Sequence, residues 1–431
     1  MSHVHVVLPG GRQVLAGELR FDRTPAGTVA AVHFTYATSY LADPGAYPLS
    51  PELPLAGGRY LAPRLFGCFA DAQPDAWGRH LLALATRRRG ERVTDLTEED
   101  FLLQVADETR LGALRFHDQG QFQAPPGEGA ATVVDIASLA RAATAVLDNR
   151  DLDNRDDDER DNDERDDDAA IGLLLRAGSS LGGARPKATV VAADGTLWLA
   201  KFASPDDRWD VQLWEVATLR LAREAGIQTP AFEYLPSTLG HGVLLARRFD
   251  RAGDGERIGY ASAATLLEHE FGSGRKPDYV ALSETLQAES ANPGADAREL
   301  FRRVAFSVLV RNTDDHMRNH GVLRGPSGWR LSPVFDVNPQ PLRIATLAPT
   351  PIAPDDAGDV DRDIRLLVDH ADAFRLTRAA AIEMVREVDR AVSRWVEVAL
   401  AAGVAHDETG FMARAFENPN RERAQNLRAG G

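Results

Sequence analysis

The stretch Asn312–Asn319 has the sequence NTDDHMRN and follows LFRRVAFSVLVR, a run of residues with helical apolar spacing. Within it, Asp314 and Asn319 stand five positions apart. At this D-x-x-x-x-N spacing, kinases present a carboxylate to the substrate hydroxyl and an amide oxygen to magnesium. A solvated acidic loop is the other interpretation of TDDH, so the meaning of the stretch depends on the motifs around it.

A further aspartate follows on the C-terminal side, in LSPVFDVNP. Asp336 lies seventeen residues after Asn319 and after a short predicted strand. Magnesium in phosphoryl-transfer sites takes one or two protein oxygens and completes its shell with substrate phosphates and water. We therefore expect Asn319 and Asp336 to hold Mg²⁺, with ATP as the nucleotide.

On the N-terminal side, the chain carries the glycine-rich stretch GSSLGGARPK, Gly178–Lys187. Gly182 and Gly183 allow backbone N–H groups to approach an anion closely, and Arg185 and Lys187 add positive charge. Taken alone, a Gly-Gly pair beside a strand is an ordinary turn. Its place in the order of the motifs favours a phosphate-binding loop.

Between these regions, Lys201 ends the apolar strand LWLAKF, fourteen residues after Lys187. A lysine in this place can reach the α- and β-phosphates as a point charge, and Glu215 on the next predicted helix could hold it. The alternative is a strand-end lysine whose ammonium extends to water. Phosphoryl transfer requires a glycine turn, a lysine, a helix glutamate, a base with an amide, and a metal aspartate, and the chain carries all five in this order.

The remaining patterns place these motifs in a larger architecture. Alternating apolar and polar residues over His3–Tyr36 predict a small antiparallel sheet, and Thr97 with Asp100 has the spacing of a helix cap. Helical periodicity covers 131–147 and most of the chain beyond 261. We predict an α+β protein with a bilobal, protein-kinase-like fold, in which a small β-rich lobe and a larger helical lobe follow an N-terminal α+β subdomain. The expected segments are the N-terminal subdomain over 1–123, a linker over 124–170, the β-rich lobe with the phosphate loop over 171–260, and the helical catalytic lobe over 261–431.

An acidic pentad repeat occupies 148–168 within the linker, with an arginine at every fifth position. It holds thirteen Asp or Glu and four Arg, a net charge of −9, so the formal charge of −15 leaves −6 for the rest of the chain. A calcium loop over 153–168 is disfavoured, because an EF-hand loop needs glycine at its sixth position and this stretch has none. We expect disorder, because almost no apolar surface could be buried to offset the entropy cost of ordering.

Charge and cysteine content limit the functional classes. The mildly acidic remainder argues against non-specific binding of nucleic acids or anionic membranes by the whole surface. The only cysteine, Cys68, cannot form an internal disulfide, which fits a reducing cytoplasm. The start MSHVHVVLPGG lacks the pattern of a signal peptide, and no apolar run approaches the ~18 residues of a membrane span. We expect a cytoplasmic protein without membrane contact.

Taken together, these motifs resemble those of the HipA-like serine/threonine kinase toxins of bacterial type II toxin–antitoxin modules. The runs SSLGGARPK, LAKF, LLARRFDR, TDDHMRNHGVL and LSPVFDVNP match that family in order, and PLSPELPL and PDAWGR resemble its N-terminal domain. The resemblance spans nearly the whole chain. It implies a kinase that phosphorylates a protein target, with an aminoacyl-tRNA synthetase as a candidate, and thereby arrests translation and growth.

The resemblance also implies a role for each motif residue. Asp314 would be the catalytic base, favoured over the adjacent Asp315 by its spacing to Asn319. Ser180, or its neighbour Ser179, would be autophosphorylated, and the dianion beside the acidic site would eject the loop and switch the enzyme off. The nucleotide-binding set would be Gly182, Gly183, Ala184, Arg185, Pro186, Lys187, Lys201, Glu215, the hinge residues Arg247, Arg248 and Phe249, and His316, Asn319 and Asp336, of which Asn319 and Asp336 would be the metal ligands.

A small DNA-binding antitoxin is the implied partner, with DNA bound only through that complex. Two other functions stay open. One is a kinase of a lipid or small-molecule hydroxyl, because D-x-H-x-x-N also resembles the pattern of the phosphoinositide kinases. The other is a nucleotide-binding co-repressor without catalysis, although the intact Lys201, Asp314, Asn319 and Asp336 argue against a degenerate site.

Overall fold

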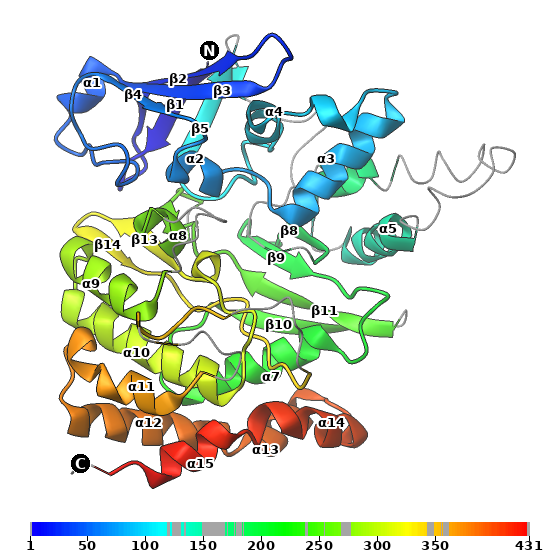
Figure 1. Ribbon diagram of the computed structural model, residues 1–431. Coiled ribbons are helices and arrows are strands. Elements are labelled where there is room, and N and C mark those ends of the chain that lie inside the picture. The colour runs from blue at the N-terminus through cyan, green and yellow to red at the C-terminus, as the bar shows by residue number, and fades with distance from the viewer. Residues whose placement is uncertain are drawn as a thin grey trace, which may run out of the picture. The chain divides into compact units, whose positions relative to one another are not determined.

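The computed structural model, shown in Figure 1, describes residues 2–118, 121–122, 131–132, 135–148, 169, 171–175, 177, 183, 185–237, 240–253, 255–268, 277–342, 349–354, 356 and 362–428. The chain forms two compact units. The first comprises Met1–Asp207 with Leu245–Ala261, and the second comprises Arg208–Leu244 with Ser262–Gly431. The acidic repeat over 148–168, for which we expect disorder, lies outside the described residues apart from residue 148. Four predicted site residues also lie outside them: Ser179, Ser180, Gly182 and Ala184.

The N-terminal part of the first unit is a six-stranded antiparallel sheet in the order β4-β3-β2-β1-β5-β6. Its strands are β1 (Ser2–Val7), β2 (Gln13–Arg23), β3 (Val29–Tyr36), β4 (Arg59–Ala62), β5 (Leu114–Asp118) and β6 (Gln121–Phe122). Val4 and Val6 of β1 are fully buried while His3 and His5 are partly exposed, as the strand period of two requires. The antiparallel sheet predicted over His3–Tyr36 is confirmed.

Short helices and an aromatic core complete this part of the first unit. The helices are α1 (Thr38–Leu41), α2 (Gly67–Asp71), α3 (Ala76–Arg88), the 3₁₀ turn η1 (Val93–Asp95) and α4 (Glu98–Leu103). Phe69 of α2 meets Phe34 and Phe116 of the sheet edge to face, at ring-centroid distances of 5.3 and 6.0 Å. The neighbouring Cys68 is buried, and burial raises the pKa of its thiol above the ordinary range.

A second sheet in the first unit carries the predicted phosphate-binding residues. β8 (Lys187–Val191) pairs antiparallel with β9 (Leu197–Lys201) and parallel with β7 (Ala131–Thr132). The helix expected over 131–147 begins later, as α5 (Ile136–Asp148), because the backbone of residues 131 and 132 pairs with β8 instead. The chain returns to this unit within β11 (Gly240–Arg247) and leaves it within β12 (Gly259–Ser262).

The second unit is mostly helical and is built around α10 (Pro293–Leu309). Figure 1 shows α10 between α9 (Tyr279–Glu289) and α11 (Ile364–Asp369), and α10 also packs against α12 (Arg378–Val392) and α15 (Pro419–Asn426). Its Leu300, Phe301 and Val304 are fully buried, which explains the apolar run before NTDDHMRN. The other elements of this unit are α7 (Val211–Glu224), β10 (Phe232–Ser237), α8 (Ala263–Leu266), η5 (Met317–Asn319), β13 (Gly321–Gly325), β14 (Gly328–Leu331), η6 (Ala371–Phe374), α13 (Trp395–Ala402) and α14 (His406–Phe416).

Helices with the length and apolar character that a bilayer crossing requires are absent from the described ranges.

The cap expected at Thr97 is present at the start of α4. Asp100 N donates to Thr97 Oγ1 at 3.4 Å, and Thr97 N donates to Asp100 Oδ2 at 2.8 Å. We expect Thr97→Ala to lower the free energy of unfolding by about 1 kcal/mol, because the Asp100 N–H loses its acceptor. Urea denaturation measures the change. Thr97→Ser keeps the hydroxyl and should behave as wild type, so an equal loss in both variants would contradict the capping role.

Candidate functional site

The loop Asn312–Asn319 separates its two adjacent carboxylates. α10 ends at Leu309, and Asn312 N donates to Ser307 O at 2.9 Å, which closes the C-terminus of the helix. The loop then turns so that Asp314 is exposed while Asp315 is only 2% exposed. Asp314 is therefore the carboxylate that an external substrate can reach, which agrees with the argument from its spacing to Asn319.

Asp315 is the centre of a buried polar network in the second unit. Its carboxylate accepts hydrogen bonds from Arg362 Nη1 at 2.8 Å, Ser307 Oγ at 2.5 Å and His320 Nε2 at 2.9 Å. Burial alone would raise the pKa of Asp315, but the Arg362 charge and the hydrogen bonds from His320 and Ser307 lower it well below its usual range. Asp315 is thus a charged structural residue.

Arg362 connects this network to three separate segments. Its guanidinium donates to the backbone oxygens of Asn312 at 3.1 Å and Thr350 at 3.2 Å, as well as to Ser307 Oγ at 3.0 Å. Thr350 N in turn donates to Asp315 O at 2.7 Å. One guanidinium therefore holds the start of the loop, the last turns of α10 and the segment at 350 together.

The hairpin of β13 and β14 places Asn319 and Asp336 at the same end. Its open end is closed by Ser332 N donating to Gly321 O at 2.9 Å. Asn319 lies two residues before this contact and Asp336 four residues after it, so both leave the same end of one hairpin. Asn319 Nδ2 also donates to Asp314 O at 2.9 Å, which fixes the amide against the loop.

A second link joins the Asp336 segment to the same loop. Gln340 N donates to Arg311 O at 3.2 Å, and Arg311 Nη1 donates to Gln340 O at 2.8 Å. Arg311 directly precedes the loop, and Asp336 itself has a left-handed backbone with φ of 54°. The candidate base and both candidate metal ligands therefore come from segments of the second unit that are hydrogen-bonded to one another.

Among the described residues, several buried polar atoms lack hydrogen-bond partners in the loop Asn312–Asn319 and in the segment around Asp336. A polar ligand bound here could supply those partners, so these atoms indicate whether the site suits a ligand. Such atoms are rare because each costs about 1–3 kcal/mol when left unpaired. Those in the site segments are Asn312 Oδ1, Thr313 Oγ1, His316 Nδ1, Asn338 Oδ1 and Gln340 Oε1. Acceptors and a histidine nitrogen in this place suit a polar ligand. His316 belongs to the predicted nucleotide-binding set.

Within the described ranges, no group of three or more His, Cys, Asp or Glu is arranged to hold a metal ion. A magnesium ion held by Asn319 and Asp336 would use one amide and one carboxylate, and nucleotide phosphates would complete its shell. The donor set fits that ion, because both ligands are oxygens.

In the first unit, Gly183 and Lys187 contact the N-terminus of α3, where Trp77 N donates to Gly183 O at 3.4 Å. Lys187 Nζ and Asp75 Oδ2 form an ion pair at 2.9 Å, with side chains only 3% and 2% exposed. Asp75 Oδ1 also accepts from Gly78 N at 2.8 Å and so caps α3. Gly183 has φ of +93°, and a Cβ there would lie 2.9 Å from Lys187 Nζ. Glycine is therefore required at this point of the turn.

Strand register brings the two candidate lysines together. Lys187 is the direct partner of Lys201 in the antiparallel β8–β9 pair, so both side chains lie on one face of the sheet. Both residues are buried, 3% and 8% exposed respectively. Glu215, in α7, is also buried but belongs to the second unit, so its contact with Lys201 stays a prediction. Arg185 is paired with Asp207, with Nη2 to Oδ1 at 2.7 Å.

The predicted hinge is held by a buried arginine. Arg248 N donates to Leu197 O of β9 at 2.9 Å. The Arg248 guanidinium, which is inaccessible to solvent, pairs with Asp250 through Nε at 2.9 Å and Nη2 at 2.7 Å. It also donates to Thr109 O at 2.6 Å. The side chain is therefore structural, and only the backbone of this segment could meet a nucleotide base, together with Phe249.

Three residues that organise these segments escape the sequence reasoning: Asp75, Asp250 and Arg362. Asp75 and Asp250 stand inside the quoted runs PDAWGR and LLARRFDR, so a local signal existed for them. Arg362 lies 47 residues from Asp315 and has no local signal.

Comparisons with known proteins identify both parts of the chain. The model of the HipA-like C-terminal domain matches residues 179–395, and the model of the HipA N-terminal domain matches residues 9–117. A Sinorhizobium fredii protein named "Putative kinase Y4mE" is 25% identical over 252 residues, covering 51% of this chain and 57% of that protein. A second protein of that organism, "Putative kinase Y4dM", is 29% identical over 169 residues, 34% of this chain and 39% of the relative. The chain spans about half the length of these curated relatives.

A solved structure matches nearly the whole chain. The Shewanella oneidensis HipA structure, determined with HipB and operator DNA, matches 98% of this chain and 97% of its own with a TM-score of 0.66 at 18% identity. At this identity the likeness shows the fold alone. The predicted mixed, kinase-like fold with an N-terminal subdomain is thereby confirmed.

The contrast between the adjacent aspartates predicts opposite effects on stability. Asp315→Asn should lower the free energy of unfolding by about 3–5 kcal/mol, because Arg362 would be left buried without its counter-charge. Asp314→Asn removes an exposed charge and should change that free energy by less than about 0.5 kcal/mol. Urea denaturation of both variants, followed by tryptophan fluorescence, measures the difference. A similar loss of unfolding free energy in both variants would show that Asp315 does not stabilise the loop.

Proposed function

Because the chain belongs to the HipA family, we propose that it is an ATP- and magnesium-dependent serine/threonine protein kinase and the toxin of a type II toxin–antitoxin module. The observation that carries the proposal is the exposed Asp314 beside the buried Asp315, on a loop to which the Asn319 amide is hydrogen-bonded. An exposed carboxylate followed five residues later by an amide on the same loop matches the arrangement by which kinases transfer a phosphoryl group to a hydroxyl.

In the proposed reaction, Asp314 accepts the proton of a serine or threonine hydroxyl and orients its oxygen toward the γ-phosphate. Asn319 and Asp336 hold magnesium, which when bound would neutralise charge on the phosphates. Lys201 and the turn Gly182–Lys187 contact the phosphates, with Glu215 supporting Lys201. The backbone of Arg247–Phe249 meets the adenine, and His316 lies near the phosphates.

The proposed substrate is a protein, with an aminoacyl-tRNA synthetase as a candidate, so that phosphorylation stops translation and growth. Autophosphorylation of Ser180, or of Ser179, is the proposed off-switch. A dianion next to Asp314 and Asp336 would be repelled by both carboxylates, which supports a switch of this kind. The proposal retains the cytoplasmic location that the single cysteine favours.

The proposed partner is a small DNA-binding antitoxin. The Shewanella protein was solved together with HipB and operator DNA, which supports a partner of the same kind here. The formal charge of −15 disfavours DNA contact by this chain alone, so DNA would be bound only through the complex.

The base assignment is tested with radiolabelled ATP and purified protein. Asp314→Asn should reduce phosphate transfer by about 10²–10⁴-fold, because the substrate hydroxyl loses its proton acceptor. Asp407→Asn is the matched control, since Asp407 is an exposed aspartate in the first turn of α14, and it should retain full transfer. Unchanged transfer in Asp314→Asn would contradict the assignment, and no transfer in wild type would favour the co-repressor function.

Phosphoproteomics of cells that express wild type or Asp314→Asn identifies the substrate class. New phosphoproteins in the wild-type cells alone support a protein substrate. A labelled lipid or small molecule without new phosphoproteins would favour the alternative kinase function.

Asp75 is expected to be a positioning residue for the phosphate loop. Asp75→Asn keeps an oxygen to cap α3 but removes the negative charge that pairs with Lys187, so the chain at Gly183 is held less firmly. We expect the KM for ATP to rise about tenfold, the factor given by about 1.4 kcal/mol of binding free energy, while kcat changes little. Steady-state kinetics separates the two constants. A drop in kcat at unchanged KM would contradict the positioning role.

A further inference from the structure

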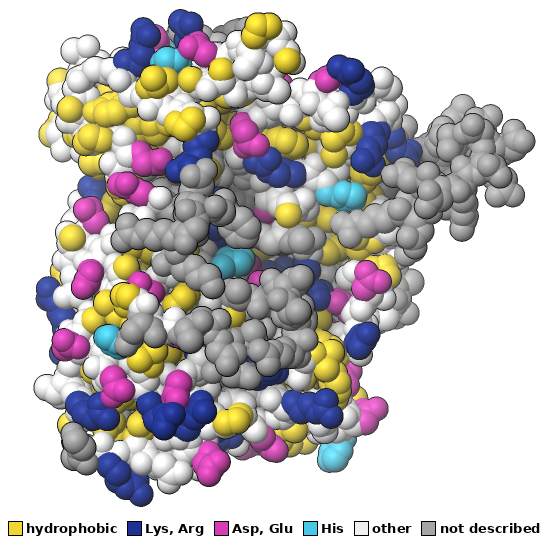
Figure 2. All heavy atoms as spheres, viewed as in Figure 1, with side chains coloured by type: hydrophobic (Ala, Val, Ile, Leu, Met, Phe, Trp, Pro, Cys, Tyr) yellow, Lys and Arg dark blue, Asp and Glu magenta, His cyan; other side chains and the backbone are white. Residues whose placement is uncertain are grey.

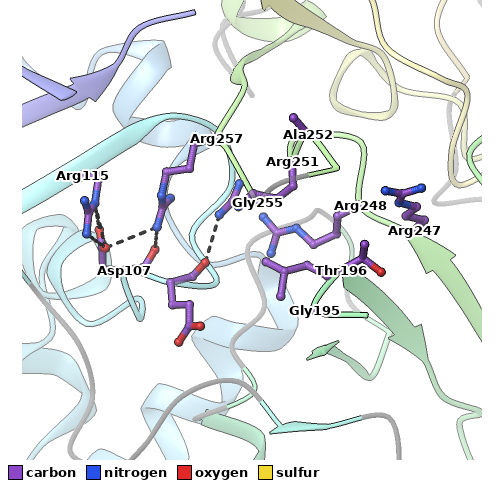
Figure 3. Close-up of a pocket in the computed structure, with 12 residues that line it drawn as sticks. Asp107, Arg115, Gly195, Thr196, Arg247, Arg248, Arg251, Ala252, Gly255 and Arg257 are labelled. Atoms are coloured by element: carbon purple, nitrogen blue, oxygen red, sulfur yellow. Dashed lines mark hydrogen bonds and ion pairs between the residues drawn. The ribbon is translucent and has the colours of Figure 1, made fainter. Parts of the chain in front are cut away.

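The first unit contains a second candidate site, a cavity of about 460 Å³ with an arginine-rich lining, shown in Figure 3. Its walls come from three segments: 107–115, 195–197 and 247–257. The lining arginines are Arg115, Arg247, Arg248, Arg251 and Arg257. A volume of this size lies within the range of small-molecule sites. We refer to it as the arginine pocket.

The arginine pocket is separate from the predicted phosphate loop. In the β8–β9 pair, Lys187 is opposite Lys201 at one end and Val191 is opposite Leu197 at the other. At ~3.3 Å per residue, four steps of strand put the two ends roughly 13 Å apart. Leu197 lines the pocket, whereas the phosphate loop lies at the lysine end. A ligand in the pocket would therefore leave the lysine end of the pair open.

Positive charge in the arginine pocket exceeds negative charge. Against five lining arginines stand two lining carboxylates, Asp107 and Glu108. The buried Asp250 pairs with Arg248 and Arg251 from behind, and counting it leaves 5 − 3 = 2 positive charges. Asp194, on the exposed turn before β9, interacts electrostatically with Arg247, and counting it as well leaves one positive charge.

Four of these arginines, Arg115, Arg248, Arg251 and Arg257, are close enough to repel one another. Burial lowers the pKa of Arg251 to about 9, and the charges of Arg248 and Arg257 add to the lowering against the effect of Asp250. Burial also lowers the pKa of Arg257 to about 10, with further lowering from Arg115 and Arg248 against the effect of Asp107. Guanidinium groups stay charged at neutral pH even so. The electrostatic cost of holding them together would be relieved by a bound anion.

The walls of the arginine pocket are fixed by hydrogen bonds to backbone oxygens. Arg251 Nη2 donates to the oxygens of Glu108 at 3.0 Å and Arg110 at 2.9 Å, and Arg257 Nη2 donates to Asp107 O. Arg115 pairs with Asp107, Nη2 to Oδ2 at 2.5 Å. These contacts make a preorganised site, which reduces the entropy cost of binding.

Arg247 differs from the other four arginines. Within the described part of the chain, its guanidinium has an electrostatic interaction with Asp194 and no hydrogen bond or ion pair at contact distance. A guanidinium presents a planar fork of N–H donors that matches two oxygens of a phosphate group. Arg247 is thus the wall residue most available to a ligand.

We propose that the arginine pocket binds a small phosphate-bearing anion at a site distinct from the phosphate loop. The surplus charge, the fixed walls and the uncommitted Arg247 all favour a multiply charged phosphate over a neutral ligand. The volume exceeds what one phosphate ion fills, so the class is a diphosphate or a phosphorylated small molecule.

Calorimetric titration of the full chain with pyrophosphate tests the proposal, at fixed ionic strength. The Lys201→Ala variant reports on the phosphate loop. Arg247→Gln and Arg115→Gln report on the arginine pocket. Arg59→Gln removes the same charge from an exposed position on β4 of the same unit and serves as the matched control. We expect the titration of wild type to resolve two pyrophosphate sites. At the arginine pocket, the Kd should rise at least tenfold in Arg247→Gln and Arg115→Gln and stay within twofold in Arg59→Gln. Lys201→Ala should weaken only the other site, because Lys201 belongs to the proposed phosphate-binding set.

The opposite outcomes overturn the proposal. Weakening by Lys201→Ala alone would assign the anion to the phosphate loop, and equal weakening by Arg59→Gln would show non-specific attraction. Absence of measurable binding by wild type would also exclude the site. Thermal unfolding of each variant shows whether it is folded, and Arg247→Gln gives the decisive result because this side chain supports no other contact at hydrogen-bond distance in the described residues. The readout is binding, so the result does not depend on kinase activity.

Discussion

The buried ion pair between Asp315 and Arg362 is the interaction on which the candidate site of the second unit depends. Both side chains are 3% exposed, and removing two charges from water carries a large desolvation cost. The cost is offset because Ser307 and His320 satisfy the remaining lone pairs of Asp315, and the oxygens of Asn312 and Thr350 satisfy the guanidinium. Because each of these buried polar groups needs its partner, the loop can satisfy all of them in only one conformation. The buried Asp315 side chain therefore anchors the loop in the interior of the unit, and the carboxylate of the neighbouring Asp314 is exposed to solvent.

The same principle recurs twice in the first unit, each time where a segment without regular structure must keep one conformation. Lys187 and Asp75 join the start of β8 to the start of α3, and Arg248 with Asp250 fixes the segment after β11. In both cases the N-terminal part of the chain supplies acceptors, either the Asp75 carboxylate or the backbone oxygens near Thr109. This explains why contacts group the N-terminal sheet with β8 and β9 in one unit. The N-terminal part supports the segment that contains Gly183 and Lys187, and it is also a sheet with its own core.

Sequence reasoning succeeded where the determining contacts are local. The capping box of Thr97 and Asp100, the sheet over His3–Tyr36 and the amphipathic α10 follow from neighbours within a few residues. It was wrong at residues 131 and 132, where pairing with β8, far along the chain, overrides a helical pattern. It did not anticipate the partners of Lys187 and Asp315, which lie 112 and 47 residues away. Spacing could favour Asp314 over Asp315, but only burial explains what Asp315 does instead.

The burial and raised pKa of Cys68 have a practical consequence for labelling the protein. The chain's one thiol is 4% exposed and, with its raised pKa, carries little of the thiolate that labelling reagents attack. The natural sequence is therefore a background into which single reporter cysteines can be introduced. Leu61 in the first unit is 65% exposed and Leu400 in the second is 41% exposed, so both positions would accept a probe without loss of core packing. A pair of spin labels there would turn the separation of the two units into a measured distance, with and without nucleotide.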